Sequence, residues 1–80
     1  MNIYVGNLNF KIKEEDLKQV FEEYGTVSSA KVITDRYSGR SKGFGFVEMD
    51  DADGKRAIDE LNGATLADRE MVVNEARPKK

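Results

Sequence analysis

The sequence predicts an α+β fold in which a four-stranded antiparallel sheet carries two helices on one face. Three observations lead to this prediction. Four segments indicate strands and two indicate amphipathic helices, in the order βαββαβ. The chain has 80 residues, which suffices for one small hydrophobic core and not for two. No internal repeat, linker or low-complexity run interrupts the order. The sheet face without helices should therefore stay open.

The first strand is predicted near the beginning of the sequence. Ile3 and Val5 fall on one face of an alternating run. Asn2 and Tyr4 fall on the opposite face, and a Gly-Asn pair ends the run. This alternation predicts that Tyr4 points away from the side that buries Ile3 and Val5.

Two helices are predicted from apolar residues at helical spacing. The first covers residues 14–24, follows Lys13 as a poor cap and stops at Gly25. The second follows Asp51 as its N-cap and ends at residues 62–63. The inner faces of the two helices consist of Leu17, Val20, Phe21 and Tyr24 in the first and Gly54, Ala57, Ile58 and Leu61 in the second. A glycine in such a face costs about 1 kcal/mol relative to alanine, unless it permits close contact with the sheet.

Three further strands are predicted over residues 27–34, 42–49 and 71–76, with a hairpin loop at residues 35–41. In residues 42–49 the side chains alternate between two faces. One face carries Lys42, Phe44, Phe46 and Glu48, and the other carries Gly45, Val47 and Met49. The second set is the one that suits a core.

Three aromatic residues, Tyr4, Phe44 and Phe46, are thereby predicted to lie on the open face. The opposite register would place Ile3, Val47 and other aliphatic residues in water, and would turn Lys42 and Glu48 toward the helices. We therefore reject that register. An aromatic platform beside cations suits single-stranded nucleic acid, because bases stack on rings while Lys and Arg meet phosphates. Scattered surface aromatics are the simpler alternative.

The charge distribution supports a basic open side. The chain has a net charge of −2. Residues 11–25 and 48–60, which contain the predicted helices, carry net charges of −2 and −4, whereas residues 31–42 carry +3. Residues 77–80 add three cations and no acid. A mildly acidic protein can thus present a positive surface to phosphates while its helical side repels polyanions.

The residue inventory disfavours an enzyme. The sequence lacks cysteine and histidine, which removes thiolate nucleophiles, the commonest general base and the commonest metal ligands. Asp51, Asp53 and Glu60 match part of a calcium-loop template, but its first position would be Met49, which faces the core. We expect no catalysis, no metal and no cofactor. No signal peptide and no apolar run of about 18 residues is present, so we expect a cytoplasmic protein without a membrane contact.

Two short segments resemble the signatures of the RNA recognition motif family. Residues 3–8 resemble its six-residue signature, and residues 42–49 meet its eight-residue signature at seven of eight positions, with Met49 as the departure. Met49 is expected to face the core, so binding is not affected. The resemblance covers residues 1–77 as one domain, followed by a short basic tail at residues 78–80. The chain also resembles short stand-alone bacterial proteins of this family, and a fragment of a longer protein is the alternative. The resemblance implies a ferredoxin-like βαββαβ sandwich.

The resemblance also implies which residues bind single-stranded RNA. Tyr4 with Phe44 or Phe46 would stack on bases or sugars, and Lys42 would hold phosphate. Further candidates lie on or beside the open face or in the hairpin loop, namely Asn2, Lys31, Asn74 and Arg77, and Arg36, Tyr37 and Arg40. For Lys31 and Arg36 a solvated strand edge is an equally good interpretation, and Tyr37 can simply cover its own loop.

Three kinds of partner are compatible with these residues. The first is single-stranded RNA, bound by a monomer that acts as a post-transcriptional chaperone or adaptor. The second is single-stranded DNA, since only contacts to the 2′-hydroxyl separate the two sugars. The third is a basic protein partner that meets the acidic helical face.

Overall fold

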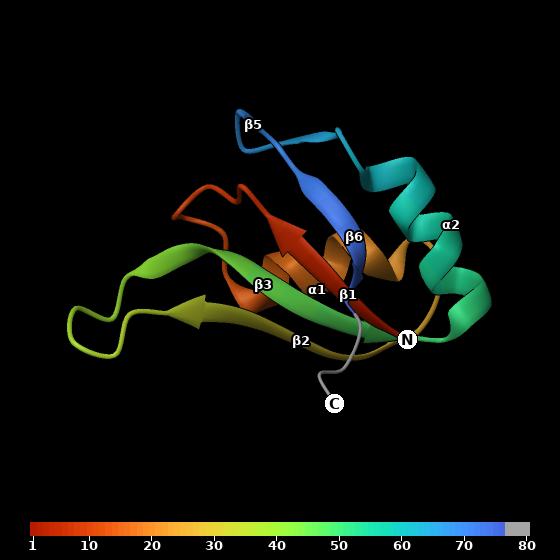
Figure 1. Ribbon diagram of the computed structural model, residues 1–80, viewed down its shortest axis with the longest axis horizontal. Helices are drawn as coiled ribbons and strands as arrows, with labels where there is room; N and C mark the ends of the chain where they lie inside the picture. Colours follow the sequence, from red (N-terminus) through yellow and green to blue (C-terminus); the bar gives the residue numbers. More distant parts are fainter. Residues whose placement is uncertain (77–80) are drawn as a thin grey trace.

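The computed structural model describes residues 1–76, and it contains the predicted βαββαβ order with one added hairpin (Figure 1). The elements are β1 (Asn2–Gly6), α1 (Glu14–Glu22), β2 (Val27–Thr34), β3 (Ser41–Met49), α2 (Asp51–Leu61), β4 (Thr65–Leu66), β5 (Arg69–Glu70) and β6 (Val72–Ala76). Arg77 and the basic tail lie outside the described residues. No helix within residues 1–76 is long and apolar enough to cross a membrane.

The four long strands form one antiparallel sheet in the order β2-β3-β1-β6. The two central strands, β1 and β3, carry the two signature segments, so the sheet brings these segments side by side. Helix α1 passes behind the sheet in Figure 1, which leaves the opposite face of the central strands uncovered. The predicted α+β class and its open sheet face are therefore confirmed.

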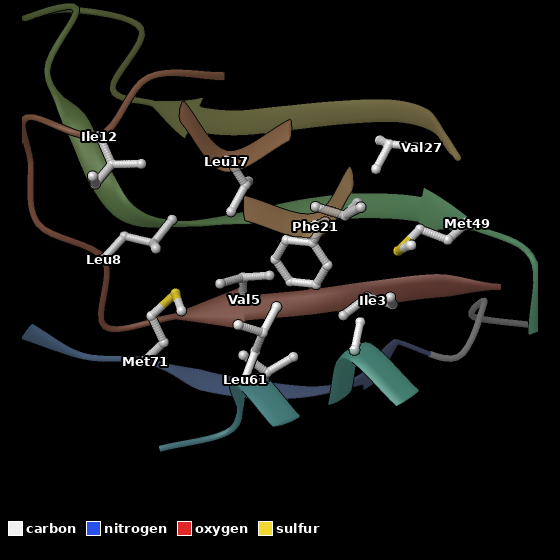
Figure 2. Close-up of a cluster of buried hydrophobic side chains, with 13 residues drawn as sticks. Ile3, Val5, Leu8, Ile12, Leu17, Phe21, Val27, Met49, Leu61 and Met71 are labelled. Atoms are coloured by element: carbon white, nitrogen blue, oxygen red, sulfur yellow. The ribbon is translucent and has the colours of Figure 1, made fainter. Parts of the chain in front are cut away.

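The core lies between the sheet and the helices (Figure 2). Ile3 and Val5 of β1 are fully buried, and so are Leu17 and Phe21 of α1. Val47 of β3 is 1% exposed. The other buried apolar residues are Leu8, Ile12, Val27, Met49, Ala57, Leu61, Met71 and Val73. The aliphatic residues of the alternating strands thus face inward, as their period of two predicts.

Both helices differ from the prediction by one or two residues at an end. Helix α1 ends at Glu22, so Tyr24 lies in a turn that bonds its N–H to the carbonyl of Phe21 at 3.0 Å. The N-cap of α2 is Asp50, and Asp51 is already helical, which corrects the predicted cap by one position. Such small shifts are expected because capping and propensity fix helix ends only loosely.

Gly54 of α2 permits the close helix–sheet contact that would justify a glycine there. A methyl group added at this position would lie 2.5 Å from Sδ of Met1 and 3.4 Å from Cδ1 of Ile3. The glycine therefore lets α2 approach the beginning of β1. Its propensity cost is offset by this packing.

The added hairpin, β4–β5, was not predicted from the sequence. Its strands have two residues each, which is too short for an alternation to appear. Its turn uses positive φ at Ala67 (51°) and Asp68 (66°), where Asn-Gly would be the usual signal. The hairpin is tied to the loop after β1, because the side-chain amides of Asn7 and Asn9 donate to the carbonyls of Glu70 at 2.7 Å and Ala67 at 2.9 Å.

Candidate nucleic-acid interface

The open sheet face carries a row of four residues, one from each long strand. Strand pairing aligns Lys31 with Phe46, Phe46 with Tyr4, and Tyr4 with Asn74. Lys31, Phe46 and Asn74 are exposed, and Tyr4 is half-buried. A cation, two aromatic rings and an amide therefore lie in line across the sheet. We call these four residues the aromatic row.

Three aromatic rings form a cluster at the centre of this face. The Tyr4 ring lies 6.0 Å from that of Phe44 and 5.9 Å from that of Phe46, measured between centroids. The Phe44 and Phe46 rings are 6.2 Å apart and perpendicular. Such tilted and edge-to-face pairs are favourable aromatic geometries, and they fix the rings relative to one another. The prediction that these residues share the open face is consistent with this geometry.

Gly6 determines how Tyr4 lies on the sheet. A methyl group at Gly6 would stand 2.5 Å from the Tyr4 hydroxyl oxygen and 2.9 Å from two ring carbons. The phenol ring therefore extends along β1 over the glycine instead of standing upright. The sequence indicated Gly6 only as the end of a strand, although its position two residues after Tyr4 places both on one face.

The β2–β3 hairpin loop is organised around Asp35. Its Oδ1 accepts the backbone N–H groups of Tyr37 at 2.8 Å and Ser38 at 3.1 Å. These two hydrogen bonds, with a smaller contribution from the positive charge of Lys42, hold the pKa of Asp35 below its ordinary value. The same loop carries Arg36, and the Tyr37 side chain is 92% exposed.

Lys42 and Arg40 lie at the loop end of the sheet and outside the aromatic row. The alternation that predicts Lys42 on the face of Phe44 is interrupted at Gly43, whose φ is +84°. The β2–β3 register also shifts at this point. The phosphate contact expected of Lys42 therefore stays a prediction, as does the role of Arg40.

Asn2 stands in the next row of the open face, paired with Glu48 on one side and Ala76 on the other. Asn2 therefore lies next to the aromatic row, and the carboxylate residue Glu48 is its neighbour on β3. The predicted Arg77 follows Ala76 directly and falls outside the described residues. Of the predicted site residues, the structure thus brings together Lys31, Phe46, Tyr4 and Asn74 in one row, with the Phe44 ring beside Tyr4 and Phe46.

Comparisons with known proteins agree with this geometry. The family model described as RNA recognition motif matches residues 3–72. RbpA from Synechocystis sp. is 49% identical over 80 residues, which cover 99% of this chain and 79% of RbpA. The crystal structure of RNA binding protein PG1 has a TM-score of 0.93 and 56% identity, and covers 99% of both chains. A complex of the Sxl-lethal protein with RNA has a TM-score of 0.92 and 30% identity, and it covers 99% of this chain and 48% of that one.

Proposed function

The chain belongs to the RNA recognition motif family, and on that premise we propose that it binds single-stranded RNA across the open face of its sheet. The observation that carries the proposal is the cluster of Tyr4, Phe44 and Phe46, with neighbouring rings about 6 Å apart on a face that α1 leaves free. Bases present flat apolar surfaces to such rings, and this stacking accepts any of the bases.

Two residues at the ends of the aromatic row supply polar contacts in this proposal. The ammonium group of Lys31, next to Phe46, would meet a phosphate. The side-chain amide of Asn74, next to Tyr4, offers donors and an acceptor for a base edge. Further phosphate contacts would come from the loop end of the sheet through Lys42 and Arg40, and Asn2 would extend the polar row.

The proposed role is that of an RNA chaperone or adaptor that binds and releases strands without chemistry. The absence of histidine and cysteine from the sequence supports a non-catalytic role. Few bases fit on one sheet of this size, so binding should be weak and tolerant of sequence. Single-stranded DNA stays an alternative ligand. The cytoplasmic location and the monomeric state expected from the sequence stay predictions.

A protein partner at the helical side is the second candidate function. Helix α1 begins with Glu14, Glu15 and Asp16, and α2 begins with Asp51 and Asp53. Neither helix has a basic residue in its last turn. This concentration of carboxylates favours a partner with a basic surface.

The test is fluorescence anisotropy of a labelled mixed-sequence RNA of about ten nucleotides at two salt concentrations. We expect wild type to bind more weakly at higher salt. The double variant Phe44→Leu/Phe46→Leu should lose about 1–3 kcal/mol of binding free energy for each base that no longer stacks. Leucine keeps an apolar side chain and removes the aromatic ring, so thermal unfolding should change little.

Duplex RNA and single-stranded DNA serve as controls in the same titration. Unchanged affinity in the double variant would contradict the stacking interface. Absence of RNA binding in wild type, together with capture of a basic protein that the double variant still binds, would favour the second candidate.

A further inference from the structure

An exposed aromatic ring, that of Phe10, lies outside the sheet in the loop between β1 and α1. The Phe10 side chain is 63% exposed, more than that of Phe46 at 38%. A single exposed aromatic residue is common on protein surfaces and needs no explanation. The surroundings of Phe10 are what set it apart.

The ring of Phe10 is held under a cation. The Arg69 guanidinium carbon lies 5.6 Å from the ring centroid, in a cation–π arrangement. Arg69 is itself fixed, because its Nη1 donates to Oδ1 of Asn7 at 3.2 Å and the Asn7 amide donates to the carbonyl of Glu70 at 2.7 Å. A ring positioned in advance loses less conformational entropy when a ligand stacks on it.

The loop that carries Phe10 is attached to the strand that carries the aromatic cluster. The N–H of Leu8 donates to the carbonyl of Gly43 at 2.7 Å. A methyl group at Gly43 would lie 3.6 Å from Cε1 of Phe10. Gly43 directly precedes Phe44 in β3, so Phe10 stands at the loop end of the strand that carries Phe44. An RNA strand that leaves the open face at this end of the sheet passes close to Phe10.

A cleft of about 510 Å³ opens beside the ring. Phe10, Ile12 and Val32 give it apolar walls, and Thr34 and Ser41 add hydroxyl groups. This combination suits a nucleobase, which has apolar faces and a polar edge.

The charges around the cleft orient a nucleotide. Glu14, Glu15 and Lys13 also line the cleft, so acids outnumber cations there and a phosphate is disfavoured. Arg69 is not among the lining residues, and its positive charge lies over the ring of Phe10 instead. A nucleotide would therefore direct its base to the cleft and its phosphate to Arg69.

We propose that Phe10, with Arg69 and the adjoining cleft, is a second stacking site that takes one unpaired base of an RNA strand beyond the sheet. This inference rests on the proposed function, because the open face has to bind the RNA strand before one of its bases reaches Phe10.

The test compares Phe10→Leu with Phe10→Tyr in the anisotropy titration with RNA of about ten nucleotides. Tyrosine keeps the ring and leucine keeps only apolar bulk, so the pair isolates stacking. We expect Phe10→Leu to weaken binding about five-fold or more and Phe10→Tyr to bind like wild type. In wild type, NMR signals of the Phe10 ring protons should move upfield when RNA is added. Thermal unfolding of both variants checks that the fold is retained.

The variant Phe46→Leu separates this inference from the proposed function. If Phe46→Leu weakens binding while Phe10→Leu does not, the second site is wrong and the sheet interface stands. Equal weakening by Phe10→Leu and Phe10→Tyr would also overturn the second site, because the ring would not be the cause. If wild type binds no RNA, or Phe46→Leu binds like wild type, the proposed function fails and the second site fails with it.

Discussion

At the scale of single residues, the interface depends on one glycine as much as on the aromatic rings. Gly6 has no side chain, and the Tyr4 ring occupies the space where one would stand. Its φ is not in the left-handed region, so the backbone would accept another residue. The glycine is therefore needed for the position of Tyr4 and not for the backbone conformation.

Gly6→Ala is expected to weaken RNA binding while leaving the fold intact. The added methyl group forces the Tyr4 ring off β1 and disturbs its pairs with Phe44 and Phe46. We expect a loss of about five-fold or more in affinity, which corresponds to the lower end of the base–aromatic stacking energy. Anisotropy titration gives the affinity, and far-UV circular dichroism checks the fold.

A double-mutant cycle with Tyr4→Leu gives the control for this prediction. In a chain that lacks the Tyr4 ring, Gly6→Ala should have no further effect on affinity. Additive losses would show that Gly6 acts by a route other than the position of Tyr4.

At the scale of elements, the short hairpin β4–β5 turns through two consecutive non-glycine residues with positive φ. Ala67 and Asp68 take positive φ, which costs a residue such as Ala67 about 1–2 kcal/mol, whereas aspartate tolerates this region better. The hairpin is nevertheless needed to place Arg69 over Phe10. Its strain is offset by the hydrogen bonds from Asn7 and Asn9.

Replacing the turn by its preferred sequence should stabilise the protein. The double variant Ala67→Asn/Asp68→Gly is expected to raise the free energy of unfolding by about 1 kcal/mol, because both residues then suit positive φ. Chemical denaturation measures the change. Gly63→Ala, at a φ of +85°, is the opposite control and should lower the same free energy. A destabilised double variant would contradict the turn assignment.

At the scale of the whole molecule, charge is divided between two sides. The open face and its loop end carry Lys31, Arg40 and Lys42, whereas both helices begin with acids. The net charge of −2 hides this division. A phosphate backbone responds to the local field and not to the sum.

Two lysines test the division of charge. Lys31 lies in the aromatic row, and Lys55 is exposed on α2. Each change to alanine removes one positive charge, so both variants have the same net charge. We expect Lys31→Ala to weaken binding and to reduce the salt slope of log affinity by about 0.7, the value for one contact to single-stranded nucleic acid. Lys55→Ala should leave the slope unchanged. If both variants reduced the salt slope by the same amount relative to wild type, net charge and not the local charge would govern binding.

Which residues share a face of the sheet follows from the sequence alone. The positions of Ile3, Val5 and Val47 in the core follow from alternation with a period of two, which is a local property of each strand. The outward placement of Tyr4, Phe44 and Phe46 follows from the same rule. Helix ends were predicted to within one or two residues, because caps are only weak local signals.

Which residues meet across elements depends on the tertiary fold and could not be predicted from the sequence. The strand order β2-β3-β1-β6 aligns Lys31, Phe46, Tyr4 and Asn74 in one row, and the hairpin β4–β5 brings Arg69 to Phe10. Gly43 likewise interrupts the alternation on which the placement of Lys42 depended. Local periodicity cannot fix these relations, because strand register and loop docking depend on hydrogen bonds between residues far apart in the chain.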